Sequence, residues 1–206
     1  MEFGVKKFEL EGREARITEP GSTNQVAMFV DLDRCVGCFG CEVSCKLEHD
    51  LPVGPRRMRV MQIGPKVAGG KLMTLYLPMN CMHCEKPACV EVCPTGAMQK
   101  RSDGIVFVDE KICIGCKSCI IACPAGSPQY NAKTGKVTKC DYCKDRVDAG
   151  LWPSCATKCA MKALSFGNIN ELSTVTREKM ARKFGEMFFA EKAENLIKIN
   201  DRGVKK

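Results

Sequence analysis

The stretch that decides the fold is Cys113-Ile114-Gly115-Cys116-Lys117-Ser118-Cys119-Ile120-Ile121-Ala122-Cys123-Pro124. Its spacing, C-x2-C-x2-C-x3-C-P, is a run that binds iron–sulfur clusters. The first three thiolates hold three corners of one [4Fe–4S] cube, and the fourth holds a corner of a second cube. Zinc favours a different pattern, with four tetrahedral ligands that usually come as two separated pairs. The run therefore predicts at least two [4Fe–4S] clusters.

Similar runs of four cysteines occur three more times, so all sixteen cysteines fall into four groups of four. Group III is the run above. The other groups are group I (Cys35, Cys38, Cys41, Cys45), group II (Cys81, Cys84, Cys89, Cys93) and group IV (Cys140, Cys143, Cys155, Cys159). Group IV contains a long excursion over residues 141–153, where we expect one or two helical turns ending near Gly150.

The number of cysteines could also suggest a disulfide scaffold. Disulfides need an oxidising compartment, but the first residues, MEFGVKKFEL, contain acidic side chains and no apolar segment of a signal peptide. The pair Arg56-Arg57 is internal and cannot act as a twin-arginine leader. We therefore expect metal-binding thiols, with disulfides as the lesser alternative.

Charge and hydropathy narrow the class of partner. No stretch approaches the roughly 20 apolar residues of a membrane span, so we expect no direct span. The formal charge of +8 counts cysteines as neutral, whereas four oxidised cubes would contribute about −8. Because no basic patch is interleaved with aromatic residues, we expect no nucleic-acid partner.

Short strands are expected at residues 26–31, 58–63, 72–77, 104–108 and 163–166. We predict an α+β fold of two ferredoxin-like two-cluster modules, with small β-sheets and short helices. The outer module comprises residues 26–50 and 125–170, with groups I and IV. The inserted module comprises residues 51–124, with groups II and III.

The two ends of the chain are predicted to be additions to these modules. Residues 1–25 would form an N-terminal arm with a short hairpin at 7–10 and 15–17. Residues 171–206 would form a C-terminal helix and tail. The helical pattern runs from Thr176 to about Ile199, and its apolar stripe consists of Met180, Phe184, Met187, Phe188, Ala190 and Leu196.

The four groups in this order resemble the iron–sulfur electron-transfer subunits of the molybdopterin oxidoreductase (dimethyl sulfoxide reductase) superfamily. The resemblance covers residues 26–167. It rests on residues 30–38 (VDLDRCVGC), 81–97 (CMHCEKPACVEVCPTGA) and 139–147 (KCDYCKDRV). It is specific for family and architecture and leaves the substrate open.

The resemblance implies that group I pairs with group IV and group II with group III. The outer cubes would then bind to Cys35, Cys38, Cys41 and Cys159, and to Cys140, Cys143, Cys155 and Cys45. The inner cubes would bind to Cys81, Cys84, Cys89 and Cys123, and to Cys113, Cys116, Cys119 and Cys93. Because every ligand position is a cysteine, we expect four [4Fe–4S] clusters and no three-iron cluster. Ala160 departs from the proline that the family often has there.

Other residues give no sign of catalysis. We find no Ser/His/Asp set, Rossmann fingerprint, P-loop or flavin signature, so the chain alone should be non-catalytic. His83 is expected to adjust a cluster's surroundings or contact a partner, because sixteen thiolates already fill sixteen cluster corners. His49 and Trp152 are expected to be packing or interface residues.

The resemblance thus implies an electron-transfer subunit that serves a large catalytic subunit with pterin-bound molybdenum or tungsten. A quinone-linked membrane subunit or a soluble donor or acceptor would lie at the other end. The alternatives are a small subunit of a tungsten aldehyde-oxidoreductase-type complex and a free, diffusible polyferredoxin. We expect a cytoplasmic location, with export alongside a leader-bearing partner as the alternative.

Overall fold

The computed structural model describes residues 25–203, which divide into two units after Asn168. The side chains of residue 68 and of residues 190–203 are outside this description. The N-terminal hairpin expected at 7–10 and 15–17 also lies outside the described residues.

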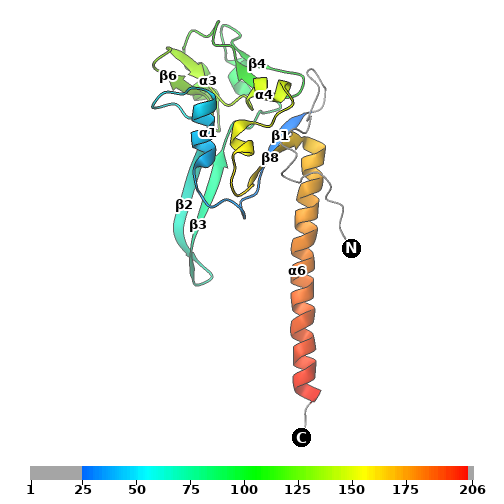
Figure 1. The fold of residues 1–206 in the computed structure, drawn as a ribbon. Coiled ribbons are helices and arrows are strands. Elements are labelled where there is room, and N and C mark those ends of the chain that lie inside the picture. The colour runs from blue at the N-terminus through cyan, green and yellow to red at the C-terminus, as the bar shows by residue number, and fades with distance from the viewer. Residues whose placement is uncertain (1–24, 204–206) are drawn as a thin grey trace. The chain divides into compact units, whose positions relative to one another are not determined.

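The first unit contains small antiparallel sheets of two strands each, joined by short helices (Figure 1). The pairs are β1 (Val26–Val30) with β8 (Leu164–Asn168), β2 (Arg59–Ala68) with β3 (Lys71–Met79), β4 (Met98–Lys100) with β5 (Val106–Val108), and β6 (Gln129–Asn131) with β7 (Lys136–Thr138). This confirms an α+β fold with small sheets. Each predicted strand is present, with ends shifted by a few residues.

The β1–β8 pair joins the two ends of this unit. Val26 lies opposite Asn168 and Val30 opposite Leu164, so the loops of groups I and IV start from the same sheet. Next to it, helix α1 (Gly40–Glu48) packs on helix α5 (Ser154–Thr157), with 2.6 Å between the hydroxyl oxygens of Ser44 and Ser154. Segments more than a hundred residues apart are therefore held together.

The residues of groups II and III meet in the same way. Helix α2 (Ala88–Glu91) packs on helix α3 (Ser118–Ala122) and on β4. The buried residues accordingly form two hydrophobic clusters. The larger contains Val26, Met58, Leu164 and Phe166 with cysteines of groups I and IV and with Cys81 of group II. The smaller contains Met98, Val106 and Val137 with Cys89 and Cys119.

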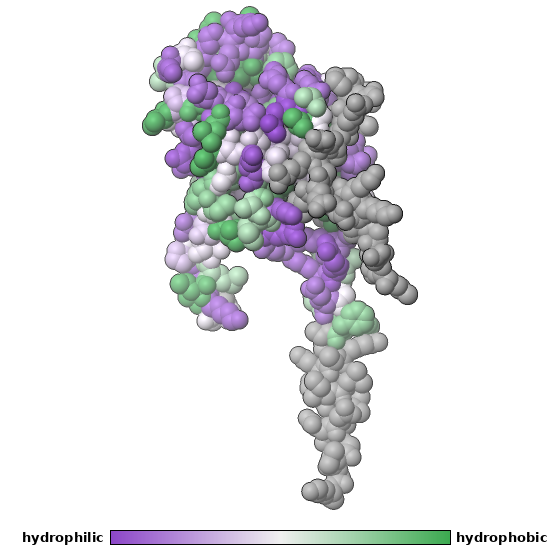
Figure 2. Space-filling view, viewed as in Figure 1, coloured by the Kyte–Doolittle hydropathy of each residue, from purple (hydrophilic) through white to green (hydrophobic). Residues whose placement is uncertain are grey.

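The β2–β3 hairpin extends away from the rest of the unit (Figure 1). It is longer than the strands expected at 58–63 and 72–77, because β2 continues past Gly64-Pro65 through an irregularity in the pairing between Ile63 and Lys66. Val60 on one face is buried, whereas Met61, Ile63 and Leu75 on the other are exposed. Figure 2 shows hydrophobic and polar surface mixed along this hairpin.

The second unit is helix α6 (Ile169–Gly203). It begins seven residues before the expected start at Thr176. Within this early part of the helix, the hydroxyls of Thr174 and Thr176 donate to the carbonyls of Asn170 and Leu172, four residues earlier. Met180, Phe184 and Met187 of the expected stripe are exposed. No helix in the described residues is long and apolar enough to cross a membrane.

Candidate metal centres

Each cysteine group has a C-x-x-C loop and, after it, a short helix that carries the third cysteine; in group IV a further helix, α4 (Lys144–Asp148), comes between the two. The third cysteine of each group lies on that helix: Cys41 on α1, Cys89 on α2, Cys119 on α3 and Cys155 on α5. The fourth cysteine follows four residues later. In group I both cysteines lie within α1, one turn apart on the same side, whereas helices α2, α3 and α5 end before Cys93, Cys123 and Cys159.

The residue before the second cysteine adopts a left-handed backbone in every group. Glycine fills this position in groups I and III, with φ +68° at both Gly37 and Gly115. A Cβ at Gly115 would lie 2.1 Å from the carbonyl oxygen of Gly135, so no larger residue fits there. In groups II and IV the position carries an aromatic ring, from His83 and Tyr142.

The first cavity lies between groups I and IV. Cys35, Cys38, Cys41 and Cys159 line this hollow, whose other walls include Val60, Pro78 and Leu164. Burial raises the pKa of Cys41 to about 11, and Cys159 and Cys38 add to this because thiolates repel one another. The backbone N–H of Ala163 donates to Sγ of Cys159 at 3.2 Å.

The second cavity lies between groups III and II. Cys113, Cys116, Cys119 and Cys93 line this hollow, with walls that include Met98, Val108 and Val137. Burial raises the pKa of Cys119 to about 11. At the exposed rim, the N–H and hydroxyl of Ser118 lower the pKa of Cys116 by hydrogen bonding to its sulfur.

The remaining eight cysteines also gather into two sets, seen in the electrostatic contacts between their thiols. Cys45 lies near Cys140 and Cys143, and Cys155 interacts with all three. Burial raises the pKa of Cys140 to about 11 and that of Cys143 to about 12. The second set consists of Cys89 with Cys81, Cys84 and Cys123. Every predicted ligand thus lies near other cysteines of its expected set.

The donor chemistry of these four sets fits an iron–sulfur cluster. All sixteen cysteines are free, and buried thiols with raised pKa values need a cation beside them before they ionise. In the described residues, no three His, Cys, Asp or Glu side chains converge as ligands of one ion. A cube does not require such convergence, because each thiolate binds a separate iron.

The loops of groups II and IV meet through their aromatic rings. His83 stacks on Tyr142 with 3.7 Å between ring centroids, and Tyr142 meets Phe166 edge to face at 5.0 Å. Lys139 lies beside this contact and is only 1% exposed, and its Nζ donates to the carbonyl oxygens of Val106 and Cys140. A cation and two stacked rings therefore lie between the cysteines of two groups.

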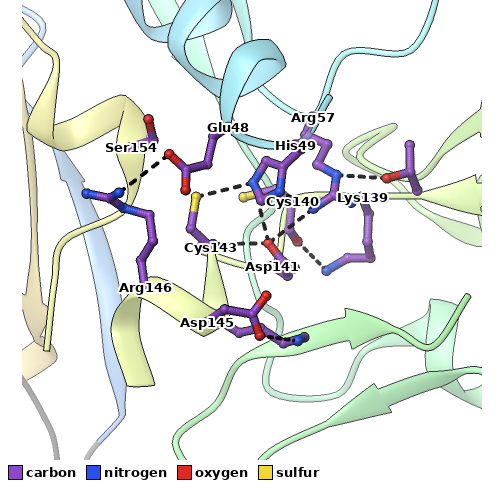
Figure 3. Close-up of polar contacts among 12 residues, drawn as sticks. Glu48, His49, Arg57, Lys139, Cys140, Asp141, Cys143, Asp145, Arg146 and Ser154 are labelled. Carbon is purple, nitrogen blue, oxygen red and sulfur yellow. Dashed lines mark hydrogen bonds and ion pairs between the residues drawn. The ribbon is translucent and has the colours of Figure 1, made fainter. Parts of the chain in front are cut away.

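A polar network connects the end of α1 to group IV (Figure 3). His49 Nε2 lies 3.3 Å from Sγ of Cys143, and His49 Nδ1 lies 3.2 Å from Nη1 of Arg57. The Arg57 guanidinium also donates to Thr138 at 2.7 Å and to Asp141 at 3.3 Å. Burial and the nearby Arg57 lower the pKa of His49. Nε2 is 3.9 Å from Asp141, too far for a hydrogen bond.

Two residues of these surroundings were missed or misjudged from the sequence. His49 was expected only to pack or to face a partner, yet its ring contacts a group IV sulfur. Lys139 was not singled out, although it is buried among cysteines. Its position directly before Cys140 was the one available signal, because a lysine beside a metal-binding thiol can serve as its counter-charge.

Comparison with known proteins gives a consistent result. Two models of a 4Fe-4S dicluster domain match residues 34–97 and 72–169. A subunit of the anaerobic dimethyl sulfoxide reductase of Escherichia coli is 46% identical over 161 residues, which is 73% of this chain and 77% of that protein. The thiosulfate reductase electron transfer subunit PhsB of Salmonella typhi is 42% identical, covering 72% of this chain and 79% of its own. The formate dehydrogenase iron-sulfur subunit of Wolinella succinogenes is 34% identical, and the match covers 79% of this chain and 90% of that protein.

Proposed function

Because the chain belongs to the iron–sulfur electron-transfer subunits of the molybdopterin oxidoreductase superfamily, we propose that it holds four [4Fe–4S] clusters serving a catalytic subunit with pterin-bound molybdenum or tungsten. The relatives are named as subunits of reductases and of a dehydrogenase. The direction of electron flow and the substrate of the complex therefore depend on the catalytic partner. The chain supplies the path along which electrons travel.

The observation that carries the proposal is the exchange of the fourth cysteine. Cys159 of group IV lies with the first three cysteines of group I, and Cys93 of group II lies with the first three of group III. This exchange is what two cubes held by paired runs require. It supports the four ligand sets given above, and it supports an outer module of groups I and IV around an inserted module of groups II and III.

In this proposal each cluster gains and loses one electron, and the chain controls how readily it does so. Apolar side chains such as Val60 and Leu164 line one cavity, and Met98 and Val137 line another. N–H donors such as that of Ala163 stabilise negative charge on sulfur. Hydrogen bonds and solvent access of this kind set the reduction potentials of clusters.

The test is anaerobic affinity purification from the native host, with elemental analysis of the chain and its companions. About sixteen irons per chain, four for each cube, together with molybdenum or tungsten in a large companion, is the expected result. Zinc in place of iron would overturn the cluster assignment. Cell fractionation tests the accompanying proposal of a cytoplasmic complex, for which export with a partner is the alternative.

A second candidate is a free polyferredoxin that carries electrons between enzymes. The exposed apolar face of the β2–β3 hairpin, with Met61, Ile63 and Leu75, favours a stable partner over free diffusion. The same purification separates the two. A lone monomer with about sixteen irons would support the free carrier. A tungsten-containing companion of the aldehyde oxidoreductase type would support a small subunit of such a tungsten complex.

A further inference from the structure

The protonation of His49 follows from its neighbours. An arginine guanidinium has donors and no acceptor, so the nitrogen facing Arg57 Nη1 at 3.2 Å, Nδ1 of His49, must accept. A neutral imidazole then carries its single proton on Nε2. That nitrogen lies 3.3 Å from Sγ of Cys143, so its N–H donates to a group IV sulfur.

Arg57 is itself held in place from several sides. Its Nε donates to the hydroxyl of Thr138 at 2.7 Å, and its Nη1 lies 3.3 Å from Oδ1 of Asp141. The same Asp141 oxygen accepts the backbone N–H of Cys143 at 3.0 Å. The network therefore runs from the C-x-x-C loop of group IV to Arg57, on to His49, and back to the same loop (Figure 3).

Other charged groups around His49 do not compete for its Nε2–H. The Asp141 carboxylate is 3.9 Å away, which exceeds hydrogen-bonding distance. Glu48, next to it on α1, faces Arg146 at 3.5 Å. The sulfur of Cys143 is the nearest acceptor that the structure gives for this N–H.

We propose that His49, held in its Nε2–H form by Arg57, is a tuning residue that raises the reduction potential of the cluster bound by Cys140, Cys143, Cys155 and Cys45. The inference rests on the ligand set of the proposed function. A reduced cube carries one more negative charge than an oxidised one, so an N–H dipole at its sulfur stabilises the reduced state more. When the electron arrives from a neighbouring cube, that cube is oxidised by one electron and the proton stays on Nε2.

The experiment compares potentials in the whole cluster-loaded chain by EPR-monitored redox titration under anaerobic conditions. His49→Leu removes the donor, and we expect one potential to fall while the other three stay constant. At a fixed solution potential the ratio of reduced to oxidised cluster should drop about threefold to tenfold, tenfold being 59 mV for one electron. His49→Gln, whose amide retains an N–H at similar reach, should restore most of the difference.

Leu47→Ala is the matched control, because Leu47 precedes Glu48 on the same helix, is uncharged and is 77% exposed. It should leave all four potentials unchanged. Four unchanged potentials in His49→Leu with full iron content would overturn the proposal, and so would equal falls in the Leu and Gln variants.

A second measurement covers the case in which His49→Leu loses its cluster. In the unaltered chain labelled with ¹⁵N only in the histidine rings, which leaves unlabelled the backbone N–H of His83 that lies 3.4 Å from Sγ of Cys81, pulsed EPR of the reduced protein should show a ring nitrogen of His49 coupled to its cluster. Loss of that coupling in His49→Gln and its persistence in Leu47→Ala would support the proposal, whereas absence of any coupling in the unaltered chain would overturn it. A chain without iron would instead refute the proposed function itself.

Discussion

Replacing Gly115 with alanine should release iron from the chain much faster than the same replacement at Gly96. The two glycines have nearly the same backbone, with φ +68° and +67°. Both belong to the inner cysteine groups, Gly115 between Cys113 and Cys116 and Gly96 three residues after Cys93. The pair therefore separates the cost of the left-handed backbone from the cost of a close contact.

The expected difference follows from the space around each Cβ. An L-residue in the left-handed region costs about 1–2 kcal/mol, and this applies to both positions. At Gly96 the added Cβ meets nothing within 4 Å, whereas at Gly115 it would lie 2.1 Å from the Gly135 carbonyl oxygen. Forcing an atom into such a space typically costs about 1–3 kcal/mol more. If local opening relieves this strain, iron release should be about 5- to 150-fold faster in Gly115→Ala than in Gly96→Ala.

The assay follows transfer of iron to a chelator by absorbance, anaerobically, from chains that start with equal iron. A Gly115→Ala chain that cannot be loaded with its inner cluster would be the extreme form of the expected result. Equal release rates in the two variants would show that the Gly135 carbonyl does not limit this position, and would refute the steric explanation.

Cys116→Ser should remove about four irons or convert one inner cluster. Electron transfer through the complex should then stop, although the catalytic partner still binds its substrate. Full physiological turnover would contradict electron transfer through the clusters. Lys139→Met removes a cation that is 1% exposed, so redox titration should show lower potentials for the clusters beside it, and unchanged potentials would show that its charge is compensated elsewhere. His83→Phe keeps a ring on Tyr142 whereas His83→Ala does not. Since an aromatic pair contributes about 0.5–1.5 kcal/mol, iron release from the alanine variant should be about 2- to 12-fold faster, and equal rates would count against the stack.

The cysteine spacing predicted the four groups, because ligand geometry is local, whereas the pairing of group I with IV and of group II with III was taken from the family resemblance and stays a prediction. In group I, for example, the C-x3-C spacing places Cys41 and Cys45 one turn apart within α1. The strands of three residues are different. The strand Gln129–Asn131 (β6) is too short to show a hydrophobic period, and it went unpredicted because only its pairing with β7 defines it.

The contact of His49 could not be predicted for another reason. It joins residues 94 positions apart, and it depends on α1 packing on α5 and on Arg57 reaching the same loop. Sequence alone shows a histidine at the end of a helix, and most such residues pack or face solvent. The buried position of Lys139 was hidden in the same way, because a single lysine next to a short strand is usually exposed.

The β1–β8 pair imposes an order on biogenesis. Val26 cannot meet Asn168 until the whole cysteine-bearing part of the chain, residues 35–159, has been synthesised. Cys159 can reach the first three cysteines of group I only after it has been made. By contrast, every cysteine of groups II and III has been made once residue 123 leaves the ribosome. Chains emerge N-terminus first, so the middle of the sequence can receive its metal during translation. The cysteines that are made first must wait, reduced and protected from oxygen, until the last ones arrive.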